Sequence, residues 1–372
     1  MFICKYIYVQ AIKKMLTKFS NKIIYAIFLI QFIGFASLKA QTGGNSVYNF
    51  LNLIPNARIA ALGGYAPAVR DHDLNVGLIN PSMLNKEMHN QLALNYLNFV
   101  SGINYGMVGY GYHHEKFGTF SAGMQYINYG KFIEADETSL QTGTFTGGEY
   151  AFNLGWGKKI DSVFSVGANF KPIYSSISNY NSFGLGIDIA GAFIHPNKLF
   201  TATFLARNIG FQLTPYTNAN REPMPLNVEL GLTQKLKHVP LRFNLIATNL
   251  QKYKLTYTDS INETKIDPAT NQIVPPNKKI GENILRHFVL GAEFLITKNF
   301  NLRFSYNYNK RKDLAVSSRT GLSGFAVGAG IKLSKFIIAY SHSFYHLAGG
   351  TDLFSLSMNL HDFKKKTTST TP

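Results

Sequence analysis

The chain has 372 residues, of which 45% are hydrophobic, 14% are aromatic and only 15% are charged, and its formal net charge is +17. Soluble domains usually carry about 25% charged residues, and disordered chains are poorer in hydrophobic residues. The mean hydropathy of −0.04 and the lack of repeated apolar runs exclude a membrane protein with several spanning helices, and the single cysteine excludes a disulfide framework and Cys-based metal sites.

Residues 1–40 have the composition of an export signal. Five lysines precede an apolar run from Ile23 to Leu38, and Ala40 follows as a small residue. Basic, apolar and small segments in this order are typical of a secretory signal peptide; an uncleaved anchor is the alternative, and Met15 is an alternative start. Without residues 1–40 the chain would carry 31 basic and 20 acidic residues and no cysteine, which fits export through an oxidising periplasm.

Residues 41–90 lack the alternation that follows them. Asn56 to Gly64 is typical of a short helix ended by glycine, and Asn80-Pro81-Ser82 is a turn signal. About fifty residues before the first strand predict a plug inside a barrel, with a small periplasmic subdomain as the alternative.

Asp71, His72 and Asp73 form the densest ionisable group near this predicted plug. They could bind a cation, but a lone D-x-D lacks the ligand count of a calcium loop. Helix capping and loop solvation are therefore the favoured interpretation.

From about residue 91 to 361 the sequence keeps a period of two. In 352–360, for example, Phe354, Leu356 and Met358 alternate with small and polar residues, a pattern that indicates strands with one apolar face. Most segments have nine residues or more, enough to cross a bilayer as tilted strands. The fourteen predicted strands are 92–99, 103–113, 118–129, 147–159, 164–177, 181–195, 200–209, 225–236, 240–250, 284–296, 300–309, 323–333, 336–344 and 352–360.

The connectors alternate in length. Those after even-numbered strands are short, whereas four of those after odd-numbered strands are long: 130–146, 210–224, 251–283 and 310–322. This asymmetry is typical of outer-membrane barrels, with short turns in the periplasm. We therefore predict an all-β fold, a 14-stranded antiparallel transmembrane β-barrel with an N-terminal plug segment and with both the N- and C-termini in the periplasm.

A lysine recurs in or beside each short turn, and an aromatic residue usually follows it. Aromatic rings prefer a membrane interface, and lysine side chains reach just beyond it. Ordinary turns of a soluble β-sandwich are the alternative, but lipid favours a closed sheet without free edges. The lysines are Lys116, Lys159, Lys198, Lys237, Lys298 and Lys335.

The histidines give no convincing metal site. His113 and His114 are neighbours on a strand and point to opposite faces. His342 and His346 have no carboxylate close to them in the sequence. We assign no catalytic, cofactor-binding or metal-ligating residue and expect no cofactor.

Two predicted outer loops are candidates for contact with a partner. Glu134, Asp136 and Glu137 make one loop acidic, and the loop 251–283 is long and contains three prolines. Long ordered loops often carry function; simple solvation of the first and disorder of the second are the alternatives.

No nucleophile elbow, zinc-protease helix or phosphate-binding glycine loop occurs in the chain, so an enzyme embedded in the barrel has no support. The basic residues form no stripe of the kind that nucleic-acid modules use, and no nucleic-acid partner is expected. Anionic outer-membrane lipids and lipopolysaccharide account for the charge more simply. Residues 362–372, with Lys364 to Lys366, form a predicted flexible tail.

Several blocks resemble one known family. The run Gln41 to Leu53, followed by Ala60-Ala-Leu-Gly-Gly64, resembles the start of mature PorQ-family proteins of the type IX secretion system of Bacteroidota. Further blocks in the same order are Asn80–Ser82, Glu87–Gln91, Gln125–Glu137, Tyr180–Gly184, Asn220–Pro223 and Tyr345–Gly349.

The resemblance implies a FadL- and PorV-like barrel of fourteen strands in the cell outer membrane. It also implies a non-enzymatic role in the attachment complex, holding a PorZ-like surface protein beside PorU/PorV-like proteins that join cargo to lipopolysaccharide. A FadL-like channel for hydrophobic small molecules is the first alternative to this anchor.

Overall fold

The computed structural model describes residues 46–65, 68–99, 102–217, 221–256, 265–266, 273–274, 280–314, 321–346 and 349–363. The predicted signal peptide, Cys4, parts of the loop 251–283 and the residues from Lys364 onward lie outside the described residues.

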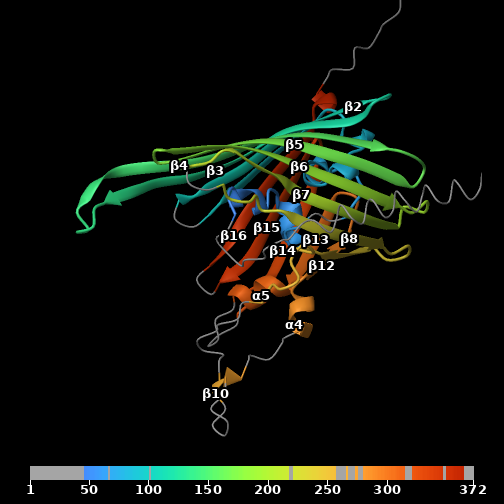
Figure 1. The fold of residues 1–372 in the computed structure, drawn as a ribbon. Coiled ribbons are helices and arrows are strands. Elements are labelled where there is room, and N and C mark those ends of the chain that lie inside the picture. Colours follow the sequence, from blue (N-terminus) through green and yellow to red (C-terminus); the bar gives the residue numbers. More distant parts are fainter. Residues whose placement is uncertain are drawn as a thin grey trace, which may run out of the picture. The chain divides into compact units, whose positions relative to one another are not determined.

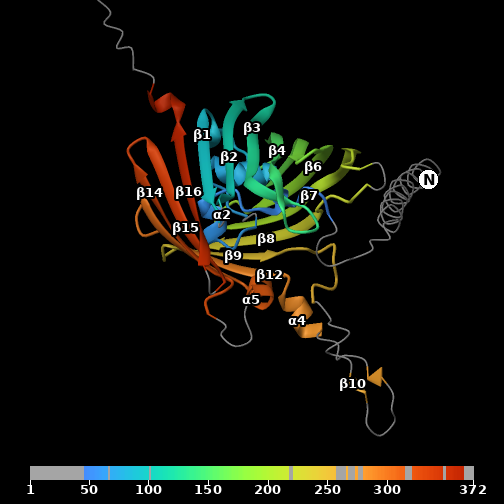
Figure 2. The same ribbon diagram turned by 90° about the vertical axis from the view of Figure 1, so that its left-hand side faces the viewer.

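The described residues form a closed antiparallel barrel of fourteen strands in which neighbours along the chain are neighbours in the sheet (Figures 1 and 2). The ring closes between the first and last strands, from the pair Gln91–Asn359 onward. The barrel strands are β1 (Gln91–Asn98), β2 (Asn104–His114), β3 (Gly118–Ala135), β4 (Gln141–Lys159), β5 (Phe164–Ile177), β6 (Tyr180–Ile194), β7 (Phe200–Thr214), β8 (Asn227–Lys235), β9 (Leu241–Ala247), β12 (Phe288–Phe294), β13 (Phe300–Asn307), β14 (Phe325–Leu333), β15 (Phe336–His346) and β16 (Gly349–Asn359). The predicted fold and strand count are confirmed.

Two predicted boundaries are wrong for physical reasons. The segment 130–146 is not a loop, because β3 and β4 continue past the barrel as a hairpin whose residues 131–140 are all exposed. Both faces of this hairpin meet solvent, so its sequence has no apolar alternation to reveal it. The strand predicted at 284–296 begins only at Phe288, because Ile280–Leu285 forms helix α4.

The remaining elements of the long connectors are small. Strands β10 (Lys265–Ile266) and β11 (Ile273–Val274) pair with each other apart from the barrel. Helix α5 (Tyr308–Leu314) follows β13, and a 3-10 helix, η5 (Leu360–Phe363), follows β16. Within the described part of the chain, no helix is long and apolar enough to cross a membrane.

The two faces of the sheet differ in chemistry, as the period of two predicts. On β16, Phe354 points outward and is 53% exposed, whereas Ser355 and Ser357 point inward and are buried. On β6, Ile187 and Ile189 lie on the outer face on either side of the buried, inward Asp188. The barrel therefore has an apolar outside and a largely polar inner wall.

Most of the described residues between 46 and 90 are buried inside the barrel, and Figure 2 shows their helices in blue behind the strands. The backbone nitrogen of Ala57 donates to the inward Ser355 hydroxyl at 2.9 Å, and Asn75 donates to Ser357 at 3.1 Å. The predicted plug is confirmed, and the alternative of a subdomain outside the barrel is wrong. Its helices are η1 (Asn49–Asn52), α2 (Ala57–Ala61), α3 (Leu74–Ile79), η2 (Pro81–Met83) and η3 (Lys86–Met88).

Side-chain caps hold these short helices at their N-termini. Asn56 accepts from Ile59 N at the start of α2, and Asp73 accepts from Asn75 N at the start of α3. Such caps satisfy backbone donors that would otherwise be buried without partners. The glycine-ended helix and the turn signal predicted in this segment correspond to α2 and η2.

Glycines on the inner wall let the plug approach the sheet closely. A Cβ atom at Gly157 or Gly167 would overlap the backbone of Pro81 in η2, and one at Gly109 would overlap Leu78 of α3. Backbone atoms cannot move aside as a flexible side chain can, so Gly157 and Gly167 determine how closely η2 approaches the wall.

We predict that Gly167→Ala destabilises the barrel by about 1–3 kcal/mol, since the added methyl group forces the plug away from β5. Glycine-to-alanine changes inside strands ordinarily stabilise a protein by roughly 0.5–1 kcal/mol, so the expected change in stability here has the opposite sign. The unfolding temperature of the purified barrel, read from heat-modified gel mobility, measures the effect.

Gly191→Ala is the matched control, because a Cβ atom there meets no atom within 4 Å. Equal unfolding temperatures for the two variants would contradict close docking of the plug.

Candidate functional site

A buried ion cluster joins the plug to the barrel wall. The guanidinium of Arg58, on α2, lies 3.0 Å from Glu293 on β12 and also contacts Asp71 at 2.7 Å and Asp73 at 2.9 Å. The Arg58 side chain is 8% exposed and Glu293 is fully buried. We call Arg58, Asp71, Asp73, Glu293, Arg242 and Arg303 the latch.

The wall completes the latch with two further arginines. Arg242 on β9 contacts Glu293 at 2.8 Å, and Arg303 on β13 contacts it at 2.9 Å. The latch thus contains three guanidinium groups and three carboxylates, and the plug supplies one of the cations and two of the anions. A buried charge is tolerated when it is paired in this way.

The ionisable groups of the latch keep one another charged. Burial alone would raise the pKa of Asp71, but the Arg58 guanidinium, its hydrogen bond and Arg242 outweigh burial and keep that pKa well below its usual value. Burial alone would lower the pKa of Arg58, but Asp71, Glu293 and Asp73 raise it well above its usual value. The Arg58–Asp71 pair therefore stays ionised through the physiological pH range.

This geometry corrects the interpretation of Asp71, His72 and Asp73. Asp73 caps α3 as predicted, but the carboxylates of Asp71 and Asp73 bind Arg58 and are not simply solvated. His72 is exposed. Within the described residues, no group of three or more His, Cys, Asp or Glu side chains could hold a metal ion.

A second set of ion pairs lies on strands β5 to β8, which continue the wall beyond β9. Lys171 on β5 contacts Asp188 on β6 at 2.6 Å, and Arg207 on β7 lies 3.5 Å from Glu229 on β8. Arg207 also donates to the carbonyl of Leu51 in η1 at 3.2 Å. The plug is thus tied to the wall at a second place, through η1.

The end of the lumen beneath the long connectors is apolar. Phe50 and Leu51 of η1 pack in one buried cluster with Tyr105, Ile127 and Ile173 of the wall. Most inward residues of the wall are polar or small, but these three are large and apolar. Large apolar residues at inward positions of a strand are therefore the sequence signal for this cluster.

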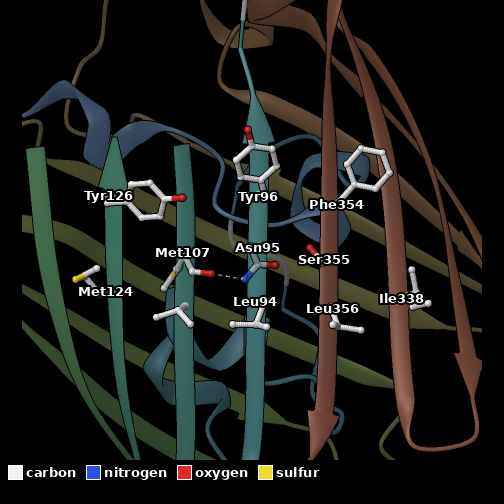
Figure 3. Close-up of a pocket in the computed structure, with 11 residues that line it drawn as sticks. Leu94, Asn95, Tyr96, Met107, Met124, Tyr126, Ile338, Phe354, Ser355 and Leu356 are labelled. Atoms are coloured by element: carbon white, nitrogen blue, oxygen red, sulfur yellow. Dashed lines mark hydrogen bonds between the residues drawn. The ribbon is translucent and has the colours of Figure 1, made fainter. Parts of the chain in front are cut away.

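The outer face carries an apolar groove of about 550 Å³ over β16, β1 and β2. Figure 3 shows Leu94, Tyr96 and Phe354 among its lining side chains, and it also shows the hydrogen bond from Asn95 to the carbonyl of Met107. Asn95 also donates to Asn75 of α3, so polar contacts to the plug lie directly behind this surface.

The histidines lie in separate surroundings. His113 contacts the Thr119 hydroxyl at 2.9 Å, whereas His114 accepts from backbone nitrogens of its own turn. The prediction that His342 lacks a carboxylate neighbour is wrong, because its Nδ1 lies 2.8 Å from Asp352. Asp352 is on the adjacent strand β16, and the strand register that brings them together was not predictable from spacing.

The described parts of the long connectors include a contact between two helices. Arg286 after α4 contacts Glu282 at 3.1 Å and Asp313 of α5 at 2.5 Å, so the two helices are tied together. Large apolar side chains are exposed around them; they are Leu250, Tyr253, Ile280, Ile284, Leu285 and Leu322. We call these six residues the loop patch.

The acidic residues of the other connector lie at the tip of the β3–β4 hairpin. Glu134, Asp136 and Glu137 are exposed, and Asp136 accepts from the backbone nitrogens of Thr138 and Leu140. The Thr138 hydroxyl also donates to Asp136 at 2.7 Å, and this bond, followed by the backbone bond from Leu140, holds the pKa of Asp136 below its usual value. Asp136 therefore has a local structural role in the turn.

No family model and no curated protein matches the chain. Among solved structures, the toluene transporter TbuX of Ralstonia pickettii is similar, with a TM-score of 0.50 and 10% identity over 84% of this chain and 100% of TbuX. The two chains share a fold. The P. putida toluene transporter TodX is less similar, with a TM-score of 0.48 and 12% identity over 83% of this chain and 99% of TodX.

We predict that Arg58→Met destabilises the folded barrel by about 3–5 kcal/mol, because Glu293 and Asp71 each lose a buried partner. Chemical unfolding in neutral detergent measures the change, and protease cleavage between residues 46 and 90 reports release of the plug.

Arg221→Met, at an exposed position outside the latch, is the control. Adding Asp73→Asn to Arg58→Met should recover part of the loss, since among the described residues Asp73 forms its ion pair with Arg58 alone, and asparagine can still cap α3. Wild-type stability of Arg58→Met would rule out the latch as the main tie of the plug.

Proposed function

We propose that the chain is a non-enzymatic outer-membrane barrel that admits small apolar molecules through its plugged lumen. The observation that carries the proposal is the fold shared with TbuX, a toluene transporter, along nearly the whole length of both chains. Fold alone does not fix a substrate, so the chemistry of the lumen has to supply the rest of the argument.

The placement in a membrane rests on the outer face of the barrel. Its side chains are apolar along the strands, whereas the inner wall is polar and buried against the plug. In lipid a sheet must close so that every backbone group is paired, and this sheet closes. The short turns at one end support an orientation with both chain ends in the periplasm, because outer-membrane barrels keep their short turns on that side.

The entry for an apolar molecule is the apolar cluster around Phe50 at the long-connector end. A molecule that enters there meets η1 directly, and Arg207 holds η1 through the carbonyl of Leu51. The latch lies further along the plug, at α2. Passage therefore requires a shift of the plug relative to the wall, and that requirement can be tested.

A disulfide between Ala68→Cys and Gly231→Cys should stop uptake by fixing the plug to β8. A Cβ atom at Gly231 would lie 3.4 Å from Cβ of Ala68, close to the separation that a disulfide needs. Uptake of toluene into proteoliposomes is the measurement, and we expect uptake above that of empty liposomes, near-complete loss in the oxidised variant and recovery on reduction.

The reduced form of the same variant is the matched control, since it differs only by one covalent bond. Toluene entry no faster than into empty liposomes, with the wild-type barrel correctly inserted, would exclude transport of this class of molecule.

The second candidate is an anchor for a surface protein, which the loop patch favours. Tyr253 is 74% exposed, and Ile280 and Ile284 of α4 are also exposed. Exposed apolar residues gathered on ordered connectors are typical of a protein contact. With the PorQ-like blocks of the sequence, this supports a PorZ-like partner within an attachment complex that also contains PorU/PorV-like proteins.

If the chain is an anchor, affinity purification from outer membranes in mild detergent should recover a surface protein. Ile280→Asp with Ile284→Asp should reduce that recovery by about tenfold or more, because charges then face the apolar contact. Ile133→Asp, an exposed apolar position on the β3–β4 hairpin, is the matched control. Recovery of no surface protein with the wild-type chain would exclude the anchor.

A further inference from the structure

A cavity of about 530 Å³ lies between the plug and the turns at the short-turn end of the barrel. Its plug side includes Arg70 and Lys86, and its wall side includes Lys159, Lys198 and His195 from the β4–β5 and β6–β7 turns. We call this cavity the vestibule. Its charged lining lies at the short-turn ends of the strands, away from Phe50 and Leu51 of η1.

The vestibule carries an excess of positive charge. Five lysine and arginine side chains line it, against the two carboxylates of Asp71 and Glu87. The five are Arg70, Lys86, Lys158, Lys159 and Lys198. Asp71 already binds Arg58 in the latch. One of the five, Lys158, donates to the carbonyl of Lys116, but a carbonyl does not neutralise its charge. The remaining positive charge faces a concave space, where low-dielectric walls strengthen its field.

Arg70 is the least compensated of these groups. It is partly buried, and its guanidinium donates a hydrogen bond to the carbonyl of Ser82 at 3.3 Å. It forms no ion pair with any other residue that the structure describes. Burial lowers the pKa of Arg70, and the field of Glu87 offsets this only in part. Among the described residues no carboxylate forms an ion pair with this partly buried guanidinium, so the position favours an anionic ligand.

We propose that the vestibule binds a phosphate group, with the Arg70 guanidinium as its principal ligand. A guanidinium presents paired donors that match two phosphate oxygens, and lysines add point charges from other directions. The hydroxyls of Thr119 and Ser162 also line the cavity and can donate to the remaining oxygens. A tetrahedral phosphate group uses donors from several directions better than a planar carboxylate does.

Phosphate of this kind can come from a free anion or from a phospholipid headgroup at the inner leaflet. The inference goes beyond the proposed function, because it concerns the opposite end of the lumen and needs no movement of the plug. Failure of toluene uptake would leave it unaffected.

The test uses the full mature barrel in neutral detergent. Inorganic phosphate is titrated by calorimetry in one arm, and retention of phosphatidylglycerol is measured by native mass spectrometry in the other. We expect Arg70→Gln to weaken binding by about tenfold or more in whichever arm binds, since a charge-assisted hydrogen bond is lost. Added salt should weaken wild-type binding as well.

Arg221→Gln removes the same charge at an exposed position outside the vestibule and should bind as the wild type does. Lys159→Gln with Lys198→Gln alters only exposed turn residues, so it tests the site even if Arg70→Gln folds poorly. Binding in the phosphate arm identifies a free anion, and binding only in the lipid arm identifies a headgroup. Binding unchanged by Arg70→Gln and by the lysine pair, or no binding in either arm, overturns the proposal.

Discussion

The fully buried carboxylate of Glu293 is the constraint on which the interior of this barrel depends. It lies on a strand whose outer face is apolar, and three guanidinium groups compensate it. One of them, Arg58, belongs to the plug, more than two hundred positions away along the chain. Without the plug, the wall part of the latch would keep two arginines against one carboxylate, and without the wall, the plug part would keep one arginine against two carboxylates. An unbalanced buried charge is strongly destabilising. The plug is therefore a structural part of the barrel.

Charge and shape have different roles in this assembly. Gly157 and Gly167 let the backbone of η2 lie directly against the wall, but close approach alone does not distinguish one rotation of the plug from another. The ion pairs of Arg58 and the contact of Arg207 with Leu51, made with different strands of the wall, specify that rotation. Buried ion pairs add little net stability over apolar packing, and specifying one arrangement is their better-attested use.

The sequence predicted what local periodicity controls and missed what distant residues bring together. The fourteen strands were predictable because one face of each meets an apolar medium and the other a packed interior. The β3–β4 hairpin was missed because both of its faces are exposed. Helix α4 was missed because its last apolar residues, Ile284 and Leu285, directly precede the strand and were assigned to it. The pair His342–Asp352 depends on strand register, and the pair Arg58–Glu293 on the folded interior, so no spacing reveals them.

The two proposed functions place opposite demands on the latch. Transport requires the plug to shift, and a shift at α2 would leave Glu293 without one of its guanidinium partners. A transport path is less costly if only η1 moves, because Leu51 is held by one hydrogen bond to Arg207 and by apolar contacts that another apolar molecule can replace. An anchor gains from the same latch, since a rigid interior holds the connectors that carry the loop patch. The mobility of η1 relative to α2 is therefore the property that separates a transporter from an anchor in this fold.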